Sequence, residues 1–357
     1  MDEDFITRAN IKRNEYLLKT EELFVANKNR WLADFAGCFR DTCVQIQKLQ
    51  DELNLSVISH LDYTMLYNNF FNRRFISDIF VYGNRSYLDN SQRCIGSYDI
   101  SFLFIFFDKL WDDLLVLKKR YVGKVTAKEI TTFMLRTIPD FYSYFVNIAR
   151  FAIAECIDKS PFVDIEKNEV FMVNVGGYMS KTETVYKERK NKDANKLAEW
   201  FSVQLWGKYI FGDYTDLDFS EKSFKYTDFR FAQFRRSTLN NTDFKGSSLI
   251  GANFRDTYME GCRLDNCSIF EADFSNAILK NASFVNARAK VGLKDKNVWK
   301  FVGFLPACFR NADLTNVDFT GADITGADFT GAVLNGANFT GAILDNAIFD
   351  GCIGRAI

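Results

Sequence analysis

Large apolar residues occupy every fifth position in the C-terminal part of the sequence, from Tyr214 to Phe284 and again from Phe309 to Phe349. The residue two places before each of them is generally small, as Ala272 is. A period of five matches neither the 3.6-residue period of an α-helix nor the two-residue period of a strand. It predicts a coil with four short faces per turn, each sending one large and one small side chain to the axis.

In such a coil, equivalent residues of successive turns lie 20 positions apart and stack at the roughly 4.8 Å spacing of paired strands. A narrow interior has no room for two large groups on one face, which explains the small residues. The predicted structural ladder includes Phe234, Phe254, Phe274, Phe319, Phe329 and Phe339.

The pentads at 312–316 (ADLTN) and 337–341 (ANFTG) resemble the repeats of the pentapeptide-repeat family. This resemblance implies a right-handed quadrilateral β-helix of about six coils over residues 211–357, similar to the quinolone-resistance members of the family. Because the motif residues of the family face inward, the resemblance predicts a fold and says little about function.

The five-residue phase continues across 288–306, but the apolar pattern does not. It would place the charged Lys294 in the interior, which is strongly disfavoured. We therefore expect an irregular insertion here, in which roughly residues 288–300 leave the coil. The gap between Ala289 and Phe309 equals one 20-residue turn, so a loop of that length can leave without disturbing the ladders. The alternative is a single distorted turn. An extruded loop would offer a partner the aromatic and basic side chains of Lys294, Lys296, Trp299, Lys300 and Phe301, unless the aromatic residues fold back onto the coil.

The N-terminal part, residues 1–193, is expected to form a mainly α-helical domain. Apolar residues at helical spacing predict one or two long helices over 4–53. Further helices are predicted over 56–82, 97–120, 126–137 and 139–157, an extended segment or hairpin between 161 and 177, and a polar loop over 180–193. Thr126 and Glu129 have the spacing of a capping box. A helix over 194–210 is expected to cap the first coil, giving an α+β multidomain fold.

Charge and composition exclude several functions. A net charge of -1 argues against nucleic-acid or anionic-membrane binding through bulk charge, so neither partner is expected. The acidic start MDEDFITRAN and eight scattered cysteines favour the cytoplasm. His60 is the only histidine, which leaves no two-imidazole chemistry, and we expect it to be an ordinary packed or surface residue of a helix.

One pair of acidic residues has the spacing of a weak metal site. Asp108 and Asp112 lie one helical turn apart, where they could bind a divalent cation or form a salt-bridged face. No nucleotide-binding loop accompanies them, so no cofactor and no catalytic residue are predicted.

The sequence favours protein recognition, with the β-helix as a docking rod and the helical domain giving specificity. Asp313, Asp318, Asp323 and Asp328 are candidate partner-binding residues. The resemblance suggests an alternative, a DNA mimic that acts on a type II topoisomerase, although these aspartates form a belt around the rod and not a stripe. An enzyme or metal site in the helical domain is a second alternative. Phe349, Ile353 and Ile357 at the last coil predict a homodimer.

Overall fold

The computed structural model describes residues 2–53, 57–83, 92–177, 182–190, 209–289 and 305–354. They form two compact units, which divide between Lys187 and Glu188. Within the described ranges, no helix combines the length and the apolar character that a bilayer crossing requires.

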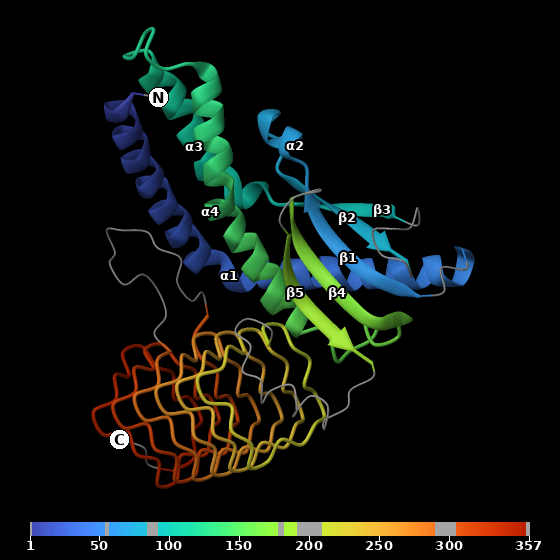
Figure 1. The fold of residues 1–357 in the computed structure, drawn as a ribbon, viewed down its shortest axis with the longest axis vertical. Coiled ribbons are helices and arrows are strands. Elements are labelled where there is room, and N and C mark those ends of the chain that lie inside the picture. The colour runs from blue at the N-terminus through green and yellow to red at the C-terminus, as the bar shows by residue number, and fades with distance from the viewer. Residues whose placement is uncertain are drawn as a thin grey trace. The chain divides into compact units, whose positions relative to one another are not determined.

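The first unit is a five-stranded mixed sheet with helices (Figure 1). Its elements are α1 (Glu3–Leu53), β1 (Ile58–Met65), α2 (Tyr67–Phe71), β2 (Ile76–Tyr82), β3 (Arg93–Asp99), α3 (Ser101–Lys118), α4 (Ala127–Ala154), β4 (Lys167–Gly177) and β5 (Thr182–Arg189). The strand order is β3-β2-β1-β4-β5, with β1 antiparallel to β2 and parallel to β4.

The sheet corrects three predictions. The helix predicted over 56–82 is wrong, because β1 and β2 occupy most of that range. In β1, polar and apolar side chains alternate from His60 to Met65, which is the two-residue period of a strand, and all eight residues are buried. The segment from residue 97 begins as the end of β3 before α3 starts at Ser101, and most of the predicted loop 180–193 that the structure describes is β5.

The helix boundary predicted before Pro139 is also wrong, because α4 continues through it. A proline inside a helix removes one backbone hydrogen bond, and here its neighbours Ile138 and Phe141 are buried and hold the helix in place. The capping box of Thr126 and Glu129 at the start of α4 is confirmed.

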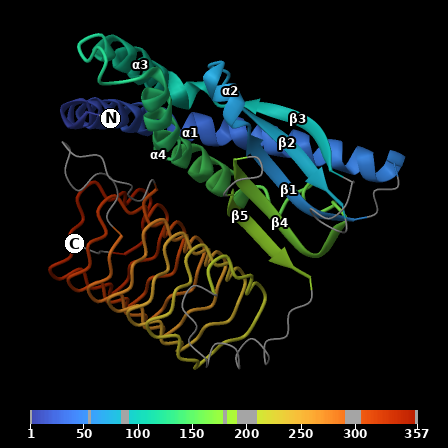
Figure 2. The same ribbon diagram turned by 45° about the horizontal axis from the view of Figure 1, so that its top comes forward.

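Helices α1 and α4 lie across one face of the sheet (Figure 2). The ring centroid of Phe35 on α1 is 5.0 Å from that of Tyr63 on β1, and Phe145 on α4 is 5.4 Å from Phe35. These contacts fix the helices against the central strand.

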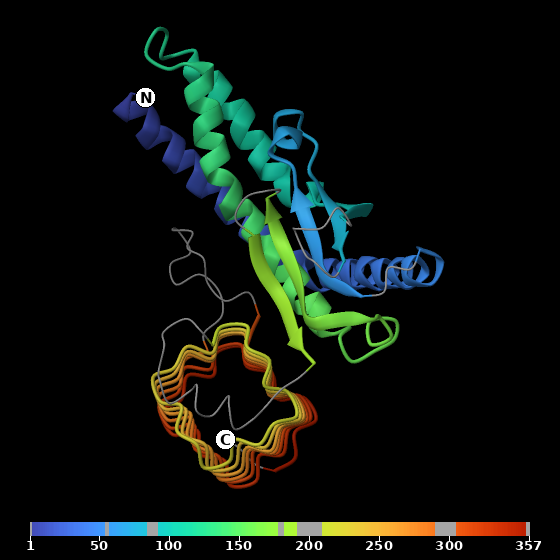
Figure 3. The same ribbon diagram turned by 45° about the vertical axis from the view of Figure 1, so that its right-hand side comes forward.

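The second unit is a β-helix whose short bridges join residues 20 apart, beginning with Asp213 and Gln233 (Figure 3). Four such rows of bridges run along it, one for each face. In the predicted ladder, the rings of Phe234, Phe254 and Phe274 stack at centroid distances of 5.1 and 5.0 Å. The small residues, such as Ala272, are fully buried beside the rings.

Each corner of the coil places a residue in the left-handed backbone region, which favours glycine and asparagine. Asn316 has a φ of 59° and Gly321 a φ of 68°. This explains why many of the pentads end in Asn or Gly, although some corners hold other residues, such as Tyr226 with a φ of 56°.

The bridges change spacing where the insertion was predicted. Asp273 pairs with Cys308 and Arg288 with Asp323, so residues 35 apart are joined instead of residues 20 apart. Cys308 pairs in turn with Asp328. Arg288 and Cys308 therefore occupy consecutive faces of the coil. The excess is therefore 15 residues, and the predicted loss of a full 20-residue turn is wrong. An excess of 15 or of 20 leaves the five-residue phase unchanged, so the sequence could not distinguish them.

Candidate functional site

The acidic pair predicted as a weak metal site binds a cationic side chain of the protein instead. Asp108 and Asp112 on α3 flank the guanidinium of Arg73, with 3.2 Å between Asp108 Oδ1 and Arg73 Nη1. The hydrogen bond from Arg73 lowers the pKa of Asp112, so its carboxylate stays charged. Among the described residues, no group of three or more His, Cys, Asp and Glu side chains is arranged to hold a metal ion.

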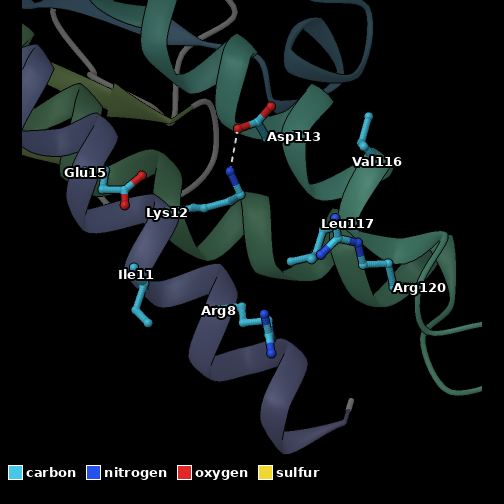
Figure 4. Close-up of a pocket in the computed structure, with 8 residues that line it drawn as sticks. All are labelled: Arg8, Ile11, Lys12, Glu15, Asp113, Val116, Leu117 and Arg120. Atoms are coloured by element: carbon cyan, nitrogen blue, oxygen red, sulfur yellow. Dashed lines mark hydrogen bonds and ion pairs between the residues drawn. The ribbon is translucent and has the colours of Figure 1, made fainter.

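A hollow of about 470 Å³ lies between α1 and α3 (Figure 4). Its lining residues are Arg8, Ile11, Lys12, Glu15, Asp113, Val116, Leu117 and Arg120. Lys12 Nζ lies 2.7 Å from Asp113 Oδ2, and the Tyr16 hydroxyl donates to the same oxygen at 3.0 Å. The hydrogen bond from Lys12 lowers the pKa of Asp113, which keeps this pair ionised.

The sequence reasoning missed this site. Helical spacing places Arg8, Lys12 and Glu15 on one side of α1, which was a usable signal. Their neighbours on α3 are about a hundred positions away, since Lys12 and Asp113 are 101 residues apart, and periodicity alone does not pair distant helices.

The sheet face opposite α1 and α4 carries a buried polar row. The Asn174 amide on β4 donates to Asp62 on β1 at 2.8 Å, and the Thr184 hydroxyl on β5 donates to Asn174 at 3.0 Å. His60 belongs to the same strand as Asp62, so its predicted place on a helix is wrong. Its side chain is only 6% exposed, and burial lowers its pKa, which favours the neutral imidazole. The hydrogen bonds in this row join three strands.

The four aspartates predicted as partner-binding residues lie on successive faces of the β-helix. Each accepts hydrogen bonds from the threonine two positions later, as Asp313 does from the Thr315 hydroxyl at 2.6 Å. Asp313 also pairs with Lys280 at 3.3 Å, and Asp328 with Arg310 at 2.6 Å. Asp318 and Asp323 form no ion pair within the described ranges.

The last lap of the β-helix is less covered than the laps before it. Phe329 is fully buried, whereas Phe339, Leu344 and Phe349 are only partly buried. Ile353 is 59% exposed beside them. The remaining predicted site residues, Lys294, Lys296, Trp299, Lys300, Phe301 and Ile357, lie outside the described residues.

The repeat pattern matches a known family of repeats. A sequence model described as pentapeptide repeats finds eight copies, in residues 227–266 and 312–351. The C-terminal region of this chain therefore contains pentapeptide repeats. Comparison with curated proteins gives no match.

Several solved structures of pentapeptide repeat proteins are similar to part of the chain. One, from the thylakoid lumen of Arabidopsis thaliana, is 29% identical over 33% of this chain and 69% of its own, with a TM-score of 0.23. HetL from the cyanobacterium Nostoc, involved in heterocyst differentiation regulation, is 15% identical over 46% of this chain and 95% of its own, with a TM-score of 0.17. QnrB1, a plasmid-mediated fluoroquinolone resistance protein, is 18% identical over 39% of this chain and 81% of its own, with a TM-score of 0.19.

Proposed function

We propose that this chain is a recognition protein in which a right-handed rod of about six coils presents docking rows to a partner protein, while the first unit adds specificity. The observation that carries the proposal is the difference between the side chains on the inner and outer sides of the rod wall. Inward positions hold stacked rings, other large apolar residues and small residues, whereas outward positions hold charged, polar and apolar side chains.

The outward side chains form fixed rows. Residues 20 apart in sequence share a row and lie about 4.8 Å apart along the rod. A partner therefore meets side chains whose spacing is set in advance, which lowers the entropic cost of binding. Asp318 and Asp323 are the predicted docking residues whose charge no ion pair neutralises within the described ranges.

We further propose that two copies associate through the last lap, by way of Phe349, Ile353 and Ile357. Partly buried ring residues and the exposed side chain of Ile353 form an apolar end, and an end of stacked strands also offers unpaired backbone groups. A second copy would bring the same apolar groups and the same strand edge, so both surfaces would be covered at once.

Sedimentation equilibrium at micromolar concentration tests the association. The wild type should have twice the mass of one chain, and Ile353→Asp should reduce it to one. Tyr258→Asp is the matched control, because Tyr258 belongs to the same row and is 53% exposed. A monomeric wild type, or equal effects of both substitutions, would contradict the association.

Site-specific photo-crosslinking in the native cell tests docking on the rod. A photoreactive amino acid placed at the exposed positions 258 and 340 should yield discrete adducts with a partner protein. The adducts should weaken when Asp318 and Asp323 are changed to Asn. The absence of adducts at every outward position tested would overturn the docking role.

A further inference from the structure

We propose that the hollow between α1 and α3 binds an amphipathic helix of a partner protein, with an acidic group at one end and a basic group at the other. This inference rests on the proposed recognition function and assigns one of its contact sites. It follows from three properties of the hollow: its exposed apolar side chains on both helices, its two charges without an ion pair among the described residues, and the order of the charges along the hollow.

Three apolar side chains from the two helices line the hollow beside five charged ones. Ile11 on α1 is 55% exposed and Val116 on α3 is 61% exposed, with the buried Leu117 between the helices. A single exposed apolar residue is ordinary. Here two come from different helices and line the same hollow, which is the arrangement that receives the apolar stripe of a helix.

Most charges of the rim already have partners. Lys12 and Asp113 pair across the two helices, and Arg8 pairs with Asp4 at 3.0 Å on its own helix. Arg120 and Glu15 form no ion pair in the described part of the chain. These two side chains are therefore charges of opposite sign that a ligand can pair without displacing an existing partner.

The order of the charges gives the hollow a direction. The contacts of Lys12 with Asp113 and of Asp4 with Tyr121 show that α1 and α3 run antiparallel. This brings Arg120 to the end of the hollow where Arg8 lies, as Figure 4 shows. Glu15 lies seven residues further along α1 than Arg8, a distance of about 10 Å at 1.5 Å per residue.

A docked helix would therefore place an acidic side chain near Arg8 and Arg120, a basic one near Glu15, and apolar ones at i and i+3 or i+4 over Ile11 and Val116. An anionic membrane surface would require a rim of one sign. The rim of this hollow carries both, which favours a protein helix.

Photo-crosslinking with the full-length protein tests the inference. A photoreactive amino acid replaces Ile11 or Val116 in the native cell, and the matched control replaces Val25, which lies on α1 and is 57% exposed. We expect the same partner segment to be captured at positions 11 and 116 and not at 25. A synthetic peptide of that segment should bind the purified protein and gain helical circular dichroism on binding.

Substitutions then separate the contacts. Val116→Asp should weaken peptide binding at least tenfold, and Val25→Asp should leave it unchanged. Arg120→Glu should also weaken it, and a peptide with its acidic residue changed to Lys should restore binding to that variant. Restoration by charge exchange would not occur if Arg120 only supported the fold.

Equal capture at position 25, an extended bound peptide, or binding insensitive to Val116→Asp would overturn the inference. Adducts at rod positions 258 and 340 with none at 11 or 116 would overturn it and leave the proposed recognition function standing. No adducts at any of these positions would overturn both.

Discussion

Phe309 stacks on Phe274 with 5.0 Å between the ring centroids and 4° between the ring planes, although 35 residues separate them in the sequence. Neighbouring rings in the same row, such as Phe309 and Phe329, are 20 residues apart and stack at 4.9 Å. The row therefore continues across the insertion without a gap, and the rod is one structure on both sides of it.

Overfilling the interior should destabilise the rod. Ala327 lies two residues before the stacked ring of Phe329 and is fully buried. Ala327→Leu should therefore lower the free energy of unfolding by about 1 to 3 kcal/mol. Ala347 holds the same repeat position in the last lap and is only partly buried, so Ala347→Leu should cost less. Urea denaturation of both variants measures the difference, and equal losses would contradict the packing described.

A hydroxyl group satisfies a carbonyl inside the rod. Thr242 is fully buried, and its hydroxyl donates to the Phe219 carbonyl at 3.0 Å. Thr242→Val keeps the volume and removes the donor, so unfolding should require about 1 kcal/mol less free energy. Thr238→Val changes an outward-facing residue of the same lap and should stay within about 0.5 kcal/mol of the wild type. If Thr242→Val left the free energy of unfolding unchanged, the hydrogen bond would contribute no stability.

The buried imidazole should make stability depend on pH. Burial lowers the pKa of His60 in the folded protein, so below the ordinary value of about 6.5 the unfolded chain binds more protons at this group. The contribution of His60 to the free energy of unfolding is therefore present above about pH 6.5 and is lost as the pH falls. His60→Gln should lose less stability than the wild type between pH 7 and pH 5.

Because the chain has one histidine, NMR titration of the imidazole protons reports this residue alone. A midpoint below 6.5 is expected. A midpoint at or above 6.5, or the same pH dependence in the variant, would contradict the assignment.

The rod could be predicted from sequence because each pentad repeats the same local rule, and one large residue in five suffices to reveal it. The first unit could not, because its strands depend on distant partners. In β1, Asp62 is buried and accepts a hydrogen bond from Asn174, which lies 112 residues away on another strand. An isolated segment with His60, Asp62 and Thr64 at alternate positions gives no sign that this polar side is covered.

The contacts of the candidate site could not be predicted for the same reason. Arg73 neutralises Asp108 and Asp112 from another element, and Lys12 meets Asp113 across two helices. Spacing identified the acidic pair, whereas tertiary structure supplied its cation. The length of the insertion was ambiguous for a different reason, since the five-residue phase is kept by any multiple of five.

The central claim is that Ala289 and Phe309 occupy neighbouring faces of one continuous rod, and a pair of deletions tests it most directly. Removing residues 290–304 takes out the 15-residue excess and leaves every later ring in phase, whereas removing 290–303 shifts every later ring by one position. Thermal unfolding should show the 15-residue deletion within a few degrees of the wild type and the 14-residue deletion strongly destabilised. Equal behaviour of the two deletions, or unfolding of the first, would contradict a continuous rod.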